Sequence, residues 1–425
     1  MRRIILLACV LVLLPAGLRG QQPGPLKESA EERLKALEER VKVLEAVIAE
    51  LRTARGPAAE AALVASAAML PATPAATAVA TVGSPPQGAP AAQLPTYGGA
   101  SSAAKVLNPD ISVIGDFLGS VGRNRARPVP SLEMHETEVG FQAIIDPYAR
   151  GDVFISFGQE GVELEESYLT FTSLPKGFVA KVGKMRAAFG KVNTLHNHNL
   201  EWTDRPLVTE NLVDGEEGIS DAGFSVSHIL PAPKGIFLEG TAQVYRGMSG
   251  ELFSAPGKKD VAFVGNLRGY KDLTESTNLD LGFSYARGHN DAGPDLTTSL
   301  YGMDATLRWR PLRRAIYHSF LARAEFIWSQ REQMPVTQKA FGLYTSAEYR
   351  LNRRWTIGGR FDRSGRAQDA GLTDNGFSAL LTYWPSEFSQ IRGQYRFARY
   401  AGGQDANELR FQFLFVLGAH GAHPF

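Results

Sequence analysis

Strand-length alternation of apolar and polar residues dominates the chain from about Leu107 to Phe425. In the clearest segment, every second residue is large and apolar: Leu409, Phe411, Phe413, Phe415 and Leu417. A period of two places one kind of residue on each face of a β-strand. No segment of this region supplies the roughly 20 consecutive apolar residues that a spanning helix needs. If the region crosses a membrane, it must therefore form a closed barrel, because open sheet edges cannot face lipid.

The residues on the polar face decide between a membrane barrel and a soluble β-sandwich. The segments 303–310, 341–350 and 391–397 repeat the alternation, with charged residues on one face and aromatic or aliphatic residues on the other. A soluble sandwich also alternates, but it rarely combines so many charges on one face with so many aromatic residues on the other. The sequence therefore predicts an all-β fold, a transmembrane antiparallel β-barrel with lipid outside and water inside.

Turn residues divide residues 107–425 into about sixteen strands, an even number as expected for a single-chain barrel. Every second connection is short, as at Asp146-Pro147-Tyr148, whereas others, such as 119–131 and 330–338, are longer and more polar. Short turns of such barrels face the periplasm, so both ends of the barrel region are predicted to lie there. The longest loop, Gly190 to Gly218, is predicted either to lie outside the cell or to fold into the lumen.

Residues 1–20 have the features of a secretory signal peptide. Arg2 and Arg3 precede an apolar run, Ile4 to Leu14, that is too short to span a membrane, and cleavage near Gly20 is plausible. The single cysteine, Cys9, lies within this segment, so no disulfide or thiol chemistry is expected in the mature chain. Removing the three arginines of the signal changes the formal net charge from +1 to −2, which gives no indication of nucleic-acid binding.

Residues 21–55 contain a heptad pattern, and residues 56–106 do not. Six apolar residues are spaced alternately by 3 and 4 positions: Leu34, Leu37, Val41, Leu44, Ile48 and Leu51. Flanked by charges, this seam favours a parallel coiled coil between protomers over a single amphipathic helix, and the residue types lean toward two strands. The following Ala/Pro-rich segment is almost uncharged and is predicted to be a flexible linker. The coiled coil is expected to lie in the periplasm.

The order of these regions, together with several barrel motifs, resembles a known superfamily. The motifs include Asn108 to Ile114, Asp146-Pro147-Tyr148, Gly161 to Glu166, Asp204 to Val208 and Ala422 to Phe425. They resemble the phosphate-selective porin O/P superfamily, and most closely a group of uncharacterised outer-membrane proteins often labelled zinc-regulated or TonB-dependent. The resemblance implies a porin-like barrel and a trimer, without an established substrate. A TonB-dependent receptor needs a plug domain and about 22 strands, for which the region is too short. The sequence also lacks a cluster of lysines on one loop, which would gather anions in a phosphate-selective channel.

Alternation also predicts which charged side chains point into the lumen. The basic ones are Arg268, Arg308, Arg310, Arg323, Arg360, Arg392, Arg396 and Arg410. The acidic ones are Glu136, Glu138, Glu239, Asp304, Glu325, Glu348, Asp362 and Glu408. Because Arg is concentrated in the second half of the barrel region and acids are relatively more frequent in the first, opposite walls would carry opposite charge. This pattern favours the lining of a channel for polar solutes. The alternative is a set of ion pairs that brace the wall.

The sequence offers two pairs of histidines as candidate metal ligands. One pair lies in the longest loop, and the other, His420 and His423, lies near the end of the chain. His196 and His198 could bind Zn or Cu together with Glu201 or Asp204. Two histidines separated by one residue do not supply four-ligand geometry, so a structural or solvent-exposed role is favoured and no metal or cofactor is predicted. No Gly-x-Ser-x-Gly nucleophile elbow is present, and no enzyme activity is predicted.

The function predicted from these features is that of a porin-like outer-membrane channel. Small polar solutes or ions would diffuse through it passively, with general or weak selectivity. The alternative is a non-channel barrel, which acts as an occluded anchor for the coiled coil, a receptor or an adhesin. Phe425, with the alternating aromatic residues before it, is the predicted sorting signal. The predicted partners are outer-membrane lipid, the barrel-assembly machinery and further copies of the chain.

Overall fold

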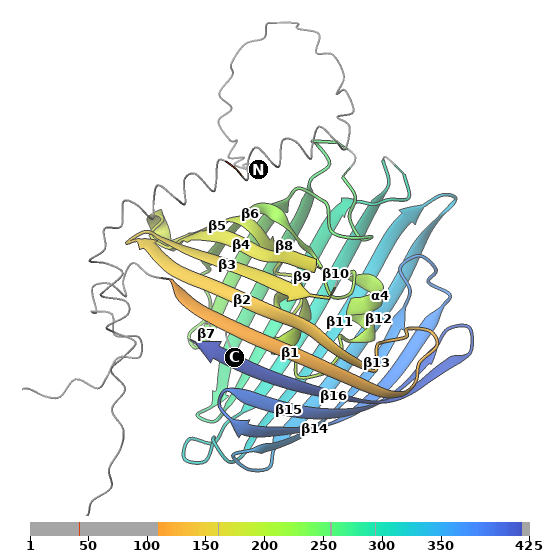
Figure 1. The fold of residues 1–425 in the computed structure, drawn as a ribbon. Coiled ribbons are helices and arrows are strands. Elements are labelled where there is room, and N and C mark those ends of the chain that lie inside the picture. Colours follow the sequence, from red (N-terminus) through yellow and green to blue (C-terminus); the bar gives the residue numbers. More distant parts are fainter. Residues whose placement is uncertain (1–41, 43–108, 160, 256, 294, 419–425) are drawn as a thin grey trace, which may run out of the picture. The chain divides into compact units, whose positions relative to one another are not determined.

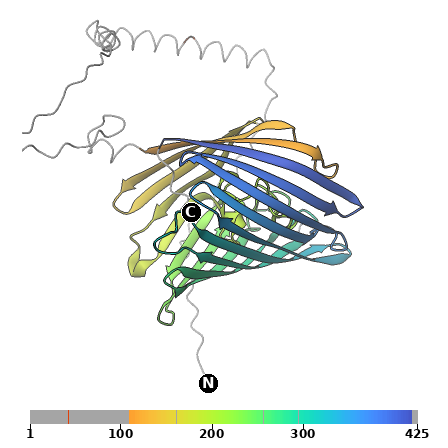
Figure 2. The same ribbon diagram turned by 90° about the horizontal axis from the view of Figure 1, so that it is seen from below.

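A computed structural model describes residue 42 and residues 109–418, apart from residues 160, 256 and 294. Within the described part, sixteen antiparallel strands form a closed barrel in which each strand pairs with its neighbours in sequence. Strand β1 pairs with β16, and Figure 1 and Figure 2 both show the first strand (orange) beside the last (blue). The prediction of an antiparallel barrel of about sixteen strands is confirmed.

The strands alternate in direction around the barrel. Their bounds are β1 (Asp110–Arg123), β2 (Leu132–Asp146), β3 (Ala149–Gly158), β4 (Gly161–Phe171), β5 (Val179–Arg186), β6 (Ser220–Ile229), β7 (Ile236–Tyr245), β8 (Ala262–Thr274), β9 (Thr277–His289), β10 (Thr297–Trp309), β11 (Ser319–Gln333), β12 (Val336–Arg350), β13 (Trp355–Gly365), β14 (Thr373–Ser386), β15 (Ser389–Tyr400) and β16 (Gln404–Gly418). The short helical segments are η1 (Pro175–Gly177), η2 (Val192–Thr194), η3 (Asn197–Asn199) and α4 (Leu207–Leu212). Among the described residues, no helix combines the length and the apolar character needed to cross a membrane.

The outer face of the barrel carries the apolar half of the alternation. Phe263, Phe283 and Phe377, for example, each expose about half of their side chain. The inner positions between them are polar or covered, as at Asp280, which is 2% exposed. An exposed apolar belt of this kind on many successive strands suits a lipid environment.

Two glycines on β1 accommodate aromatic rings at the seam where the barrel closes. Gly115 pairs with Phe415 and Gly119 with Phe411, so each glycine lies opposite a phenylalanine of β16. A Cβ atom at either glycine would overlap the ring of the opposite phenylalanine. The rings therefore lie flat across β1, and the first and last strands share one continuous apolar surface.

The connections follow the predicted alternation of short and long only in part. The end of the barrel where β1 begins and β16 ends, here called the turn end, has short connections such as Glu275–Ser276 between β8 and β9. The opposite end, here called the loop end, has the long connection between β5 and β6. The prediction of a long connection at 330–338 is wrong, because β11 and β12 are separated only by Met334 and Pro335. Polar residues continue the pairing here, since Gln330 to Gln333 bond across to Val336 to Lys339.

The predictions for the first 106 residues and for the end of the chain are not tested by this structure. The signal peptide, the linker and Phe425 lie outside the described residues. Of the predicted coiled coil only Lys42 is described, and it is helical.

Candidate functional site

The connection between β5 and β6, residues 187–219 and here called the inserted loop, lies inside the barrel. It contains η2, η3 and α4, and α4 contacts the inner side of β11, β12, β13 and β14. Figure 1 shows α4 among these strands. Of the two positions that the sequence allowed for the longest loop, the structure shows the one folded into the lumen.

Apolar side chains of the inserted loop pack against apolar side chains of the inner wall. The loop contributes Phe189, Val192, Leu200, Trp202, Val208 and Leu212. The wall contributes Val264, Leu300, Ile327, Tyr344 and Leu380. Burying one such side chain stabilises the folded state by about 1.5–3 kcal/mol. The expectation of a uniformly polar inner face is therefore wrong on this part of the wall, since the loop excludes water from it.

Asp204 ties the inserted loop to the wall through several polar contacts. Its Oδ1 lies 3.1 Å from an Nη of Arg360 and its Oδ2 lies 3.0 Å from Nε of Arg396. The side-chain amide of Gln394 donates a hydrogen bond of 2.6 Å to the same carboxylate. Burial alone would raise the pKa of Asp204, but the two guanidinium groups hold this pKa well below its usual range. Asp204 therefore stays ionised and ties the loop to β13 and β15.

Three further residues of the wall hold the loop at its start and middle through polar contacts. The carboxylate of Glu325 accepts hydrogen bonds from the backbone N–H groups of Lys191 (3.3 Å) and Val192 (3.4 Å). Arg392 donates to the carbonyl oxygen of Trp202 at 3.2 Å. Arg323 forms an ion pair with Glu201. These wall residues satisfy loop groups that would otherwise be buried without a partner, a state that costs about 1–3 kcal/mol per group.

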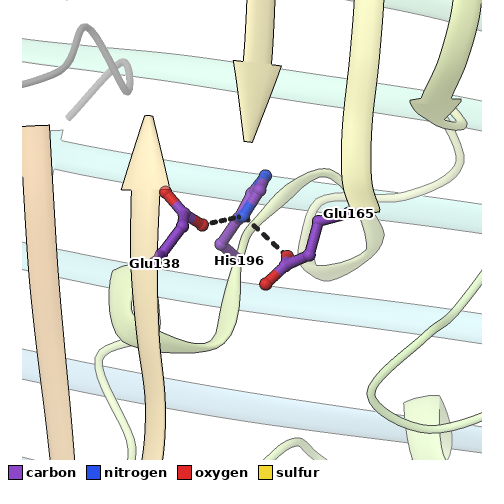
Figure 3. A group of neighbouring side chains, drawn as sticks. All are labelled: Glu138, Glu165 and His196. Carbon is purple, nitrogen blue, oxygen red and sulfur yellow. Dashed lines mark hydrogen bonds and ion pairs between the residues drawn. The ribbon is translucent and has the colours of Figure 1, made fainter. Parts of the chain in front are cut away.

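The two loop histidines lie against four carboxylates on β2 and β4. Nδ1 of His196 is 2.6 Å from Oε2 of Glu138 and 2.9 Å from Oε2 of Glu165, as drawn in Figure 3. Its Nε2 is 3.3 Å from Oε2 of Glu166. Burial alone would lower the pKa of His196, but its hydrogen bonds to the three carboxylates raise this pKa well above the usual value. Nδ1 of His198 lies 3.1 Å from Glu136, and both rings are buried.

Two β-bulges explain why consecutive polar residues of β2 and β4 both reach the inside. Across β3 and β4, Phe154 pairs with Glu166 and Ile155 pairs with Leu164, so Glu165 is the extra residue. Across β1 and β2 the register shifts in the same way at His135. A bulge breaks the strict alternation of faces and re-aims a side chain, and bulges are frequent beside functional sites. Glu165 and Glu166 therefore both project toward the inserted loop.

The inserted loop separates two cavities. The larger, about 690 Å³, lies toward the loop end and is lined by basic and acidic residues, including Arg186, Arg396, Arg410, Glu136 and Glu165. The smaller, about 220 Å³, lies toward the turn end and is dominated by arginine: Arg308, Arg310, Arg323, Arg350 and Arg392, with Glu201 and Glu348. Loop residues 195–205 contribute to both linings.

The charged residues predicted to face the lumen all lie on the inner face, but their surroundings differ. Arg308, Arg310, Arg323, Arg392 and Glu348 line the smaller cavity, and Arg396, Arg410 and Glu136 line the larger. Arg360, Glu138, Glu325 and Asp304 are buried, as are Asp362 and Glu408. Arg268 pairs with Asp280 on β9, and Glu239 lies opposite Arg268 on β7.

The expectation that water surrounds the lumenal arginines is wrong for three of them. Arg360, Arg392 and Arg396 are 1%, 5% and 3% exposed, because the inserted loop covers them. Arg360 also lies over the ring of Trp202 with its guanidinium carbon 4.9 Å from the ring centre, a favourable cation–π contact. The sequence left open the alternative that ion pairs brace the interior. Arg360 and Arg396 form such ion pairs, and the element that they brace is the inserted loop.

Sequence reasoning did not identify Asp204 as an anchor or the histidines as a carboxylate-bound pair. The signal that could have indicated the second is the run Glu163-Leu164-Glu165-Glu166, in which two adjacent acids interrupt the alternation. For Asp204 no comparable local signal exists, because its partners Arg360 and Arg396 are more than 150 residues away in sequence.

Comparison with known proteins identifies a relative in sequence and several similar folds. No protein-family model matches the chain. A protein of Aquifex aeolicus (strain VF5), described as uncharacterized, is 30% identical over 390 residues, covering 76% of this chain and 81% of that protein.

Among the solved structures that resemble the barrel are a porin and a second outer-membrane protein. An anion-selective porin from Comamonas acidovorans has a TM-score of 0.51 and 10% identity, covering 73% of this chain and 99% of that one. OmpT, an outer membrane protein of Vibrio cholerae, has a TM-score of 0.50 and 8% identity, covering 73% and 97%. At this level of identity the likeness shows the fold, which is that of a porin-like barrel.

Proposed function

The chain belongs to the family of the uncharacterized Aquifex aeolicus protein, and because that membership assigns no activity, we propose a function from the barrel itself. The protein is an outer-membrane channel for passive diffusion of small polar solutes or ions, with general or weak selectivity. The porin-like fold and the apolar outer belt support this location. The resemblance of the sequence motifs to the phosphate-selective porin O/P superfamily also supports an outer-membrane channel.

The observation that carries this proposal is the pair of charged cavities on the two sides of the inserted loop. Residues 195–205 border both cavities, so a solute that crosses the barrel must pass this segment. A loop that narrows the lumen between two cavities lined by charged residues has the architecture of a selective constriction. Five arginines and two acids line the smaller cavity, and this excess of positive charge attracts anions or the negative ends of zwitterions. The acids of the larger cavity keep the preference modest.

Conductance of the purified full chain in planar bilayers tests the proposal. We expect steady ion conductance and a small preference for anions. Replacing Arg310 and Arg350 with serine should shift the reversal potential toward cations, because both side chains line the smaller cavity. A charge about 8 Å from a passing ion in water changes its energy by about 0.5 kcal/mol, so permeability should change about twofold per arginine. High salt should reduce the shift.

The matched control removes two exposed charges that line neither cavity, Lys234 and Arg353. This double serine variant should keep the wild-type reversal potential. An equal shift in both double variants would mean that general surface charge, and not the smaller cavity, sets the preference.

A second candidate function is an occluded barrel that serves as an anchor, receptor or adhesin. The many anchors of the inserted loop favour it, since Asp204, Glu201 and His196 all bond to the wall. Absence of conductance from a folded barrel would support this function. We further propose that the protein is not an enzyme.

The protein is also proposed to assemble as a trimer, as the resemblance to porins implies. Deleting residues 26–55 should leave a folded barrel that still associates, although less stably, because barrel walls bury more area than a few heptads. Light scattering of both forms in mild detergent measures the mass. Purely monomeric barrels after the deletion would assign assembly to the heptad segment instead.

A further inference from the structure

We propose that His196, Glu138 and Glu165 form a binding site for a divalent first-row transition metal ion. The three side chains come from the inserted loop, β2 and β4, and converge where the loop meets the wall (Figure 3). One ligand atom from each lies within 4.8 Å of the others, and all three residues are buried. The proposal concerns metal binding and does not depend on whether the barrel conducts.

The geometry places the two carboxylates around one ring nitrogen. Nδ1 of His196 is 2.6 Å from Glu138 and 2.9 Å from Glu165, which are hydrogen-bond distances. Ligand atoms about 2.0–2.2 Å from a tetrahedral metal lie about 3.3–3.6 Å from one another. Metal entry therefore requires the three groups to separate by less than about 1 Å, with the metal taking the place of the Nδ1 proton. Side-chain rotation of two glutamates can supply this movement.

The other nitrogen of His196 already has the partner that metal-binding histidines use. Nε2 lies 3.3 Å from Glu166, whose second oxygen accepts a 2.6 Å hydrogen bond from the backbone N–H of Arg186. A carboxylate on the distal ring nitrogen fixes the ring orientation and raises the basicity of the ligating nitrogen. The side chain of Arg186 also bonds Glu165 at 3.2 Å. Two of the three proposed ligands, His196 and Glu165, are thus oriented by surrounding groups.

The β4 bulge supplies the adjacent pair of acids on which this arrangement depends. In a regular strand, Glu165 and Glu166 would face opposite sides of the barrel wall. The register shift between Phe154 and Ile155 brings both inside, so one contacts Nδ1 and the other contacts Nε2. The local distortion is therefore what allows one histidine to meet carboxylates at both ring nitrogens.

The larger cavity reaches the proposed site at Glu165. Glu165 lines this cavity of about 690 Å³, as do Glu136 and Asn197. Three protein ligands leave a fourth position for water, as in sites that exchange ligands. An ion arriving from the loop end can therefore reach the site without unfolding the barrel.

The ligand set indicates which metals fit. One imidazole and two carboxylates suit Zn²⁺, Mn²⁺ or Fe²⁺. Ca²⁺ takes six to eight oxygen ligands, and a neutral imidazole is a poor substitute. Two carboxylates also balance the charge of a divalent ion, which lowers the cost of burying it. Bound metal would replace hydrogen bonds with coordinate bonds and fix the inserted loop to β2 and β4.

The test is isothermal titration of Zn²⁺ alone into metal-free full chain in detergent, with Ca²⁺ as a comparison ion. We expect one Zn²⁺ per chain and no comparable Ca²⁺ binding. His196→Ala should weaken Zn²⁺ binding by at least about 100-fold, since it removes a direct ligand. His228→Ala is the matched control, because His228 is half-buried on β6, away from the three proposed ligands, and stacks only on Phe178 among the described rings. It should bind Zn²⁺ as the wild type does.

A conservative variant covers the case in which His196→Ala does not fold. Glu165→Gln keeps the size of the side chain and a hydrogen-bond acceptor, and we expect it to weaken Zn²⁺ binding about 10-fold or more. Folding is checked for every variant by heat-modifiable mobility. Zn²⁺ affinity within threefold of wild type in a folded His196→Ala or Glu165→Gln variant would overturn the proposal. An equal loss in His228→Ala would overturn it as well, since binding would then be adventitious.

Discussion

Replacing Asp204 with asparagine is expected to release the inserted loop from the barrel wall. The substitution keeps the shape of the side chain but removes the charge that faces Arg360 and Arg396. Both guanidinium groups are almost fully buried, and neither can lose its proton at working pH. Removing one partner from a buried ion pair typically costs about 3–5 kcal/mol. Arg360 keeps its pair with Asp362 and Arg396 keeps its pair with Glu408, so we expect a cost at the lower end of this range, about 3 kcal/mol. The substitution destabilises the docked state of the loop, because undocking exposes both arginines to water.

Limited proteolysis of the folded barrel measures this effect directly. We expect cleavage within residues 187–219 of Asp204→Asn under conditions in which the wild type resists. Asp405→Asn is the control, because Asp405 pairs with Arg399 at an exposed site where such pairs contribute about 0–1 kcal/mol. A resistant loop in Asp204→Asn would contradict the assignment of Asp204 as the main anchor. Apolar packing of Trp202 and Leu212 would then be the principal cause of docking.

The same anchor predicts how loop docking responds to acid. The pKa of Asp204 is lower in the folded protein than the value of about 3.9 for an exposed aspartate. A depressed pKa means that the ionised form contributes stability above pH 4, and that this contribution is lost as pH falls below that value. Docking through Asp204 should therefore persist through mildly acidic conditions.

The strand pattern was predictable because it is a local property of the sequence. Apolar and polar residues alternate from Leu409 to Leu417 because one face of the strand contacts lipid and the other faces the interior of the barrel. The closed barrel and its strand number follow from that pattern and from the turn residues. The connection 330–338 was misjudged because polar strand ends beyond the apolar belt look like loop sequence.

The interior was less predictable because it depends on contacts between distant residues. Whether Arg360 or Arg396 faces water depends on where residues 187–219 fold, and nothing near either arginine encodes this. The apolar loop residues Trp202 and Val208 indicate in hindsight that the loop is buried, since an exposed loop would not carry them. His196 and His198 could not be placed from their spacing alone, because their partners come from two bulged strands.

Replacing Phe411, Phe413 and Phe415 together with lysine is expected to abolish assembly of the barrel. Phe411 and Phe413 are exposed on the outer face of β16, and Phe415 continues the same face at half burial. A lysine costs about 2–4 kcal/mol near the middle of the lipid face and less toward its edge, so the three together cost about 5–10 kcal/mol. That range matches the whole net stability of a typical protein, about 5–15 kcal/mol. The substitutions also remove the rings that cover Gly115 and Gly119 where β1 meets β16.

The measurement is the amount of folded, heat-modifiable protein in the outer-membrane fraction of expressing cells. Leu417→Lys is the matched control, since it places one lysine on the same face at the end of β16, where the cost is about 0–1 kcal/mol. The control should assemble at close to the wild-type amount, and the triple variant should not assemble. Normal amounts of folded triple variant would show that this face does not contact lipid. That result would contradict the orientation of every strand in the barrel, because alternation links the outer face of β16 to the inner face that holds the loop.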